Sequence, residues 1–162
     1  EAITETFLVV SVFPHISSTN INVCKGALEV ATAVASSNQL GFVVADRCVR
    51  ATAPDNKPYS NIVQLLSNVD VGIQALTLEF INACYSTCID AQWSKCTSTH
   101  LSLKSKFFVI YTQADLDDAL ELHGMSRAVK KIAKAVQDEK LKLQLYTYQV
   151  YDLVLPLFSF FV

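Results

Sequence analysis

The sequence predicts an all-α fold, a single-domain helical bundle of about five to six helices, for three reasons. Hydrophobic residues make up 51% of the 162 residues, and they recur every three or four positions over long stretches, as on one face of an α-helix. Glycine and proline number only four each, so residues that favour turns are scarce. A chain of this length normally folds around one hydrophobic core, so we expect residues 1–162 to form one domain.

The first segment of the chain permits two interpretations. Residues 1–14, EAITETFLVVSVFP, are apolar from Phe7 to Phe13, and such a short run fits either a strand or a docked helix. Residues 101–111 are equally ambiguous, because the motif KFFVIY is as typical of a strand as of a helix. The alternative fold is therefore α+β, with short strands near residues 6–13 and 106–112.

Two helices are predicted after this segment. In residues 21–35, apolar side chains recur at helical spacing from Val23 to Val34. Asn38 is a suitable N-cap for a second segment, which extends to about residue 53. Gly41 and several β-branched valines weaken the helical pattern there, so a strand remains an alternative.

The longest helical pattern covers residues 60–95. Apolar residues step by three or four positions throughout this stretch, and Ser60 is placed to cap its N-terminus. Asp70 is a second potential cap, so we expect either one long helix or two helices that meet near residues 67–70. The preceding segment APDNKP, residues 53–58, is predicted to be a loop because Pro, Asp and Asn favour turns.

Two further helices are predicted after a break at residues 97–100, TSTH. One covers residues 113–123 and stops at Gly124, a residue type that often follows a helix C-terminus. The other begins with Ser126 as its cap and carries apolar residues in a heptad pattern. The heptad positions form two rows, which are Val129, Val136, Leu143, Val150 and Leu157, and Met125, Ile132, Tyr146, Leu153 and Phe160.

Five cysteines, Cys24, Cys48, Cys84, Cys88 and Cys96, raise the question of metal binding, redox chemistry or disulfides. The close pair has C-x-x-x-C spacing, unlike zinc-ligand pairs or C-x-x-C redox motifs, so we expect neither a metal site nor a redox centre. Cys84 and Cys88 lie one helical turn apart, too far to bond each other. We therefore favour inter-helix disulfides among Cys24, Cys48, Cys84 and Cys88 over buried thiols, with Cys96 free or paired to another chain.

Two groups of opposite charge flank Gly124. The acidic group contains Asp115, Asp117, Asp118 and Glu121, and the basic group contains Arg127, Lys130, Lys131 and Lys134. Either the two groups attract each other across a solvated helix hairpin, or the basic group binds an anionic partner such as lipid headgroups, nucleic acid or an acidic protein. The net charge of −2 argues against nucleic acid.

No sequence motif for catalysis is present. The phosphate-binding G-x-G-x-x-G and P-loop patterns are absent, and so are the H-E-x-x-H and G-x-S-x-G patterns. Each of the three histidines stands in a loop or at a helix end, without a nucleophile that it would activate. We therefore predict no catalytic residues, no cofactor and no enzymatic activity.

The chain ends in the apolar segment VYDLVLPLFSFFV, residues 150–162. It is too short for a transmembrane helix, which needs about 20 apolar residues. We expect another surface to cover it, because a free apolar tail would aggregate. The candidate residues for an apolar ligand site or an interface are Phe107, Phe108, Leu143, Val150, Leu157, Phe158, Phe160 and Phe161.

The first functional hypothesis is a secreted, disulfide-supported bundle that binds a small apolar molecule or lipid in its interior. The alternative is a structural or assembly subunit that oligomerises or binds a partner protein through its C-terminal helix and apolar tail. The chain begins at Glu1 rather than Met, which we interpret as removal of a signal peptide. An intracellular product cut from a larger precursor would begin in the same way.

Overall fold

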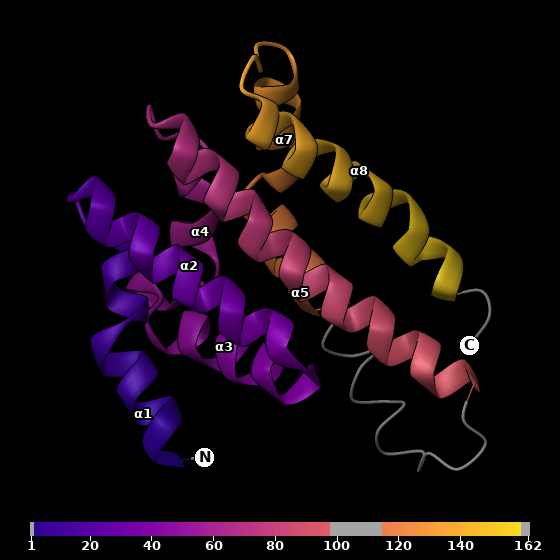
Figure 1. The fold of residues 1–162 in the computed structure, drawn as a ribbon, viewed down its shortest axis with the longest axis horizontal. Helices are drawn as coiled ribbons and strands as arrows, with labels where there is room; N and C mark the ends of the chain where they lie inside the picture. Colours follow the sequence, from indigo (N-terminus) through magenta and orange to yellow (C-terminus); the bar gives the residue numbers. More distant parts are fainter. Residues whose placement is uncertain (1, 98–114, 160–162) are drawn as a thin grey trace.

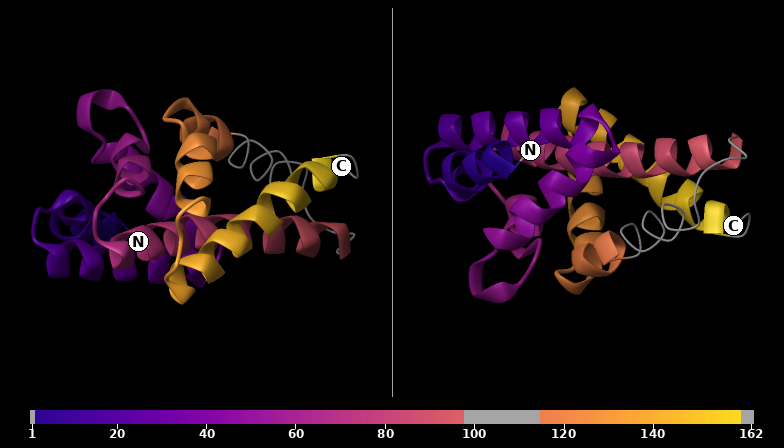
Figure 2. Two further views of the ribbon diagram at one scale, coloured as in Figure 1. Left: turned by 90° about the horizontal axis from the view of Figure 1, so that it is seen from above. Right: turned by 90° about the horizontal axis from the view of Figure 1, so that it is seen from below.

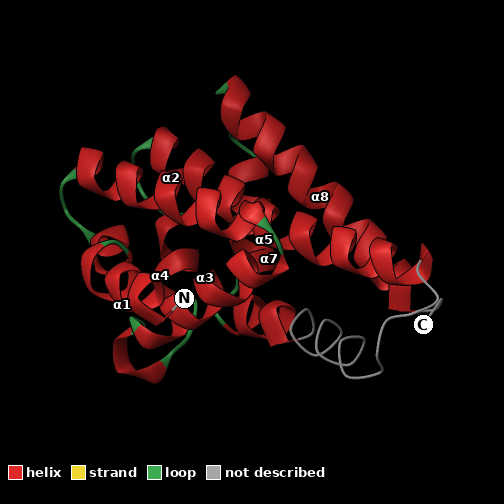
Figure 3. Cartoon of the chain, turned by 60° about the horizontal axis from the view of Figure 1, so that its bottom comes forward, coloured by secondary structure: helices red, strands yellow, loops and turns green. Residues whose placement is uncertain are grey.

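The computed structural model describes residues 2–97 and 115–159, and the side chains of residues 5–88 and 115–154 within them. The described residues form helices joined by short connections, and they contain no strand (Figure 3). The all-α prediction is confirmed. The alternative strand at residues 6–13 is wrong, because these residues belong to a helix and the turn after it, and the alternative strand at residues 106–112 lies outside the described residues.

The eight α-helices in the described part of the chain slightly exceed the five to six predicted. The helices with their bounds are α1 (Ala2–Ser11), the 3-10 helix η1 (Phe13–Ser17), α2 (Ile21–Ser37), α3 (Gln39–Ala51), the 3-10 helix η2 (Pro54–Asn56), α4 (Ser60–Leu65), α5 (Val71–Thr97), α7 (Met125–Ala133) and α8 (Glu139–Ser159). The eighth α-helix, which carries no label in the figures, covers residues 115–122.

Helix α5 is the central element of the fold. It packs against α2 on one side and against α8 on another (Figure 1). Helix α3 packs on α2, and α1 joins them through η1, so the N-terminal helices gather along one flank of α5. The turned views in Figure 2 show that α8 crosses α5 at an angle. The position of α8 therefore depends on its contact with α5.

Asparagine and aspartate side chains set where four of the helices begin. Asn20 caps α2, Asn38 caps α3, Asp70 caps α5 and Asp138 caps α8, each by accepting hydrogen bonds from backbone N–H groups of the first turn. The caps predicted at Asn38 and Asp70 are confirmed. Since Asp70 starts a new helix, the pattern over residues 60–95 divides into α4 and α5, which is the second of the two expected arrangements.

The predicted C-terminal helix is also divided, because Asp138 starts α8 after a break at residues 134–138. The capping role expected of Ser126 is wrong. Ser126 lies inside α7, where its hydroxyl donates to Glu121 Oε2 over 2.6 Å and its backbone N–H donates to the same oxygen over 3.2 Å. Gly124 adopts φ +80°, the left-handed conformation expected of a residue that follows a helix.

The disulfide prediction is wrong for the four described cysteine side chains. Cys24, Cys48, Cys84 and Cys88 are buried free thiols, and they fill the core as small apolar groups. Burial raises the pKa of Cys48 to about 11 and the pKa of Cys88 to about 12. Cys96 belongs to α5, but its side chain lies outside the described ones.

Candidate functional site

One face of α8 attaches this helix to α5. Leu141, Leu145 and Tyr148 are buried, and their spacing of four and three residues places them on one side of the helix. Asn82 of α5 adds a polar contact, because its Nδ2 donates to the backbone oxygen and to the side-chain Oε1 of Gln144, each over 2.9 Å. Apolar packing and this double hydrogen bond together fix how α8 is rotated about its axis.

An aromatic cluster extends the same contact. The ring centroid of Tyr85 on α5 lies 6.0 Å from that of Tyr148 and 6.3 Å from that of Tyr151, both on α8. The Tyr85 hydroxyl donates to Asp117 Oδ1 over 2.5 Å, and burial raises the pKa of both groups. The helical segment 115–122 is thereby joined to α5 beside α8.

The opposite face of α8 is apolar and exposed. Helix geometry turns each residue by about 100°, so residues 143, 146, 150 and 153 lie roughly opposite the buried face. We call this set the α8 stripe, and its exposed side chains are Leu143 (62%), Tyr146 (62%), Val150 (55%) and Leu153 (72%). Single exposed apolar residues are common on proteins, but an aligned group of this kind is typical of an interaction surface.

The α8 stripe contains part of the heptad pattern predicted from the sequence. On α7, the heptad residues Met125, Val129 and Ile132 are buried, and they attach that helix to the core. On α8, the continuing heptad positions from Leu143 to Leu153 face solvent. The two helices thus use the same sequence pattern for different purposes, core packing on α7 and an exposed surface on α8.

The basic residues predicted as an anionic-partner site lie together on α7 and at Lys134, the residue that directly follows this helix. We call this set the α7 basic row, and it consists of the exposed residues Arg127, Lys130, Lys131 and Lys134. Together with Glu121 and Ser126, the row lines an open depression with a volume of about 590 Å³. The row faces away from the core because the opposite side of α7 is the buried one.

The acidic group before Gly124 bonds elsewhere. Asp115 Oδ2 lies 2.8 Å from Arg50 Nη2, which joins the segment 115–122 to α3. Asp117 accepts the hydrogen bond of Tyr85, and Glu121 accepts those of Ser126. Among the residues that the structure describes, no ion pair joins the acidic group to the α7 basic row, so the expected attraction across the hairpin is not observed.

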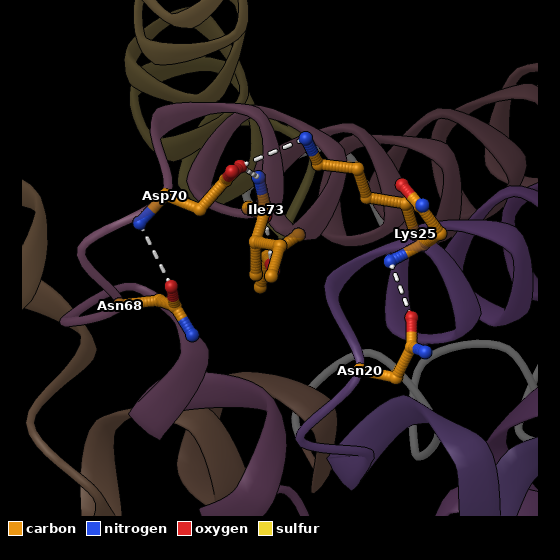
Figure 4. Close-up of polar contacts among 7 residues, drawn as sticks. Asn20, Lys25, Asn68, Asp70 and Ile73 are labelled. Atoms are coloured by element: carbon orange, nitrogen blue, oxygen red, sulfur yellow. Dashed lines mark hydrogen bonds and ion pairs between the residues drawn. The ribbon is translucent and has the colours of Figure 1, made fainter.

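Sequence reasoning missed a polar junction between α2 and α5, which Figure 4 shows. Lys25 Nζ lies 3.0 Å from Asp70 Oδ1, and the same oxygen accepts the Ile73 N–H over 2.9 Å. The hydrogen bond from Lys25 and then that from Ile73 hold the pKa of Asp70 below its ordinary value of 3.8. Asn68 Oδ1 in turn accepts the Asp70 N–H over 2.8 Å. Because each of these groups bonds within the protein, the junction holds α2 against the start of α5 and is not a candidate binding site.

The described residues contain no group of three or more His, Cys, Asp or Glu side chains that would hold a metal ion. Within the same residues, no helix has the length and apolar character needed to cross a membrane. Of the predicted ligand or interface residues, Leu143 and Val150 lie in the α8 stripe. Leu157 and Phe158 belong to α8, but their side chains lie outside the described ones. The remaining predicted residues, Phe107, Phe108, Phe160 and Phe161, lie outside the described part of the chain.

Comparison with known proteins identifies a family for this chain. A protein-family model described as the FHOD1/3 FH3 domain matches residues 1–103, which is more than half of the chain. No curated protein and no solved structure matches the sequence. The FH3 domain is a non-catalytic helical domain of formin proteins that acts in protein–protein interactions. The match ends before α7 and α8, so it covers neither the α8 stripe nor the α7 basic row.

The match corrects two expectations. The secreted localisation is wrong, because formin-family proteins are intracellular, and the free thiols of the described cysteines agree with such a compartment. A small apolar ligand or lipid in the bundle interior gains no support from the family or the structure. The alternative hypothesis, binding of a partner protein, agrees with both.

Proposed function

We propose that this chain, which belongs to the FHOD1/3 FH3 domain family, is a non-enzymatic interaction domain that binds an amphipathic helix of a partner protein along the α8 stripe. The family supports the class of function, and the exposed stripe supports the location on α8. That residues 1–162 act as one domain remains a prediction.

The spacing of the α8 stripe supports a helix as the bound element. Leu143, Tyr146, Val150 and Leu153 are separated by three, four and three residues, which is the pattern of apolar contacts between two packed helices. The stripe extends over about 15 Å at 1.5 Å per residue, or roughly three turns. A partner helix with apolar residues at matching positions would bury these side chains, as in other helix-mediated interfaces.

The fixed rotation of α8 favours a preformed surface. The buried side of α8 and the Asn82–Gln144 contact hold the helix on α5 while the stripe points away from it. A rigid surface loses little conformational entropy when a partner binds, so more of the interaction free energy is available for affinity.

A site-specific crosslinking experiment tests the proposal. A photoreactive amino acid replaces Tyr146, which lies in the stripe, or Gln149, which is exposed on the same helix outside the stripe. After irradiation in cells, mass spectrometry identifies the crosslinked segment, and a synthetic peptide of that segment is titrated against the purified chain by calorimetry. The same titration is repeated with the double variant Leu143→Glu/Val150→Glu.

The proposal expects a crosslink at position 146 that is absent at position 149. It further expects a helical peptide whose binding the double variant weakens by at least tenfold. Equal crosslinking at both positions would contradict it. Sedimentation analysis tests whether a second copy of this chain covers the stripe instead. A wild-type dimer that becomes a monomer in the double variant would assign the stripe to self-association.

A further inference from the structure

We propose that the α7 basic row is a second docking surface, which binds an acidic segment, a run of Asp and Glu side chains, of a partner protein. This inference goes beyond the α8 stripe, because it concerns a different helix and a different type of interaction. It rests on the placement of the four basic side chains, on their lack of carboxylate partners in the described residues, and on the shape of the surface that they line.

The placement follows from how α7 packs. Met125, Val129 and Ile132 are buried at a spacing of four and three residues, so the opposite side of the helix faces solvent. The basic row occupies that side at positions i, i+3, i+4 and i+7, from Arg127 to Lys134. These positions extend over about 10 Å of the helix, which puts the four cations within reach of one short peptide segment.

Within the described residues, the basic row lacks the carboxylate partners that several other cations have. Lys25, Arg50 and Lys142 each lie within 3.0 Å of a carboxylate oxygen. None of the four cations of the row has an ion-pair partner among the described residues, although the acidic group is close in sequence. Burial of Asp117 against Tyr85 and the pairing of Asp115 with Arg50 commit two of those acids to other contacts.

The local charge is opposite to that of the whole chain. Four basic side chains and a single carboxylate, that of Glu121, line the depression, while the chain as a whole carries a net charge of −2. The Glu121 carboxylate already accepts two hydrogen bonds from Ser126, so it is oriented toward the start of α7. A concentration of positive charge on an acidic protein attracts and orients negatively charged partners.

The residues that line the depression favour an acidic peptide over a membrane or a nucleic acid. They include no apolar side chain, whereas helices that bind at a membrane surface combine basic residues with apolar ones that insert. They also include no aromatic side chain on which a base of single-stranded nucleic acid would stack.

Fluorescence anisotropy with a labelled polyglutamate peptide tests the proposal, with a polyglutamine peptide as the neutral probe. The wild-type chain is compared with Lys130→Glu/Lys134→Glu, which reverses two charges of the row. The control variant Lys57→Glu/Lys140→Glu changes the net charge equally at two exposed residues that do not line the depression. Circular dichroism establishes that all three proteins have the same helix content.

The expected result is binding of polyglutamate but not polyglutamine, weakened by about tenfold or more in the row variant and less than about threefold in the control. Binding should also weaken as salt is raised, because salt screens charges on the surface. Equal weakening in both variants would overturn the proposal, since it would mean a response to net charge alone. Absence of polyglutamate binding by the wild-type chain would also overturn it.

Two parallel measurements separate the other anionic partners. Vesicles containing phosphatidylserine and a single-stranded oligonucleotide are tested with the same three proteins. One contrary result is a wild-type chain that binds vesicles or the oligonucleotide but not polyglutamate, together with a row variant that loses that binding. This result would assign the row to that partner and overturn the proposal. The α8 variant Leu143→Glu/Val150→Glu should bind polyglutamate as wild type does. The proposal for the α8 stripe and the proposal for the basic row are therefore tested separately.

Discussion

Asn82 on α5 donates two hydrogen bonds to Gln144 on α8, one to its backbone oxygen and one to its side-chain Oε1, each over 2.9 Å. Asn82 is 4% exposed, so water does not readily replace these bonds. The contact fixes the rotation of α8 about its own axis. With Leu141 and Leu145 held against the core, the side chains of the α8 stripe are held toward solvent.

The first prediction concerns this contact. Asn82→Ala should lower the free energy of unfolding by about 1–3 kcal/mol, because both hydrogen bonds are lost in a buried position. Gln144→Ala should cost less, since the backbone oxygen that accepts one of the bonds remains. Urea denaturation followed by circular dichroism measures both variants. A larger cost for Gln144→Ala than for Asn82→Ala would mean that the contact does not hold α8 in the way described.

The helix boundaries illustrate what the sequence could predict. Asn38 and Asp70 are short polar side chains that precede apolar periodic segments, and that local chemistry is enough to locate a cap. Asp138 has the same chemistry, but the heptad pattern continues through it, so the break before α8 was missed. The pairing of Lys25 with Asp70 joins distant parts of the chain, and no local pattern predicts such a contact.

The second prediction concerns Asp70 and pH. The hydrogen bond from Lys25 lowers the pKa of Asp70 below its ordinary value of 3.8, so the folded state favours the carboxylate. The resulting stabilisation is present above the unfolded-state pKa and is lost as the pH falls through the lower folded-state pKa. Asp70→Asn should therefore reduce Tm near neutral pH, and its difference from wild type should narrow below pH 3.8.

The variant Asp70→Ala provides the comparison for this experiment. Asparagine retains an oxygen that accepts the Ile73 N–H, whereas alanine does not, so Asp70→Ala should be less stable than Asp70→Asn at every pH. Calorimetric melting curves across the acidic range measure both effects. A Tm difference between Asp70→Asn and wild type that stays constant through the acidic range would show that the charge of Asp70 contributes no stability.

The third prediction concerns thiol reactivity. In a Cys96→Ser background, the four remaining thiols should react with iodoacetamide only after denaturation, because burial limits access and raises their pKa values, to about 12 for Cys88. Mass spectrometry of the native and the denatured protein, each without reductant, counts the labelled residues. Fewer than four labels after denaturation without reductant would indicate a disulfide and contradict the buried-thiol assignment.

The heptad pattern illustrates what the sequence could not predict about the site. Periodicity shows that apolar side chains share a face of a helix, but it does not show which surface that face meets. On α7 the face meets the core at Val129 and Ile132, and on α8 it meets solvent at Leu143 and Val150. The difference arises because a second apolar row, which includes Leu141 and Leu145, packs α8 on α5. Only the three-dimensional arrangement shows that the row with Leu141 and Leu145 is buried and that the row with Leu143 and Val150 is exposed.

The fourth prediction separates these two faces of α8 by their effect on stability. Leu143→Glu/Val150→Glu should change the free energy of unfolding by no more than about 0.5 kcal/mol per substitution, because both side chains are more than half exposed. Leu145→Ala should cost about 2–5 kcal/mol, since it leaves a cavity where α8 packs on α5. Chemical denaturation of the purified chain measures both. If the double variant were as destabilised as Leu145→Ala, the α8 stripe would be covered by another part of this chain in solution. It would then be unavailable to a partner, and the proposed docking of a helix on α8 would be wrong.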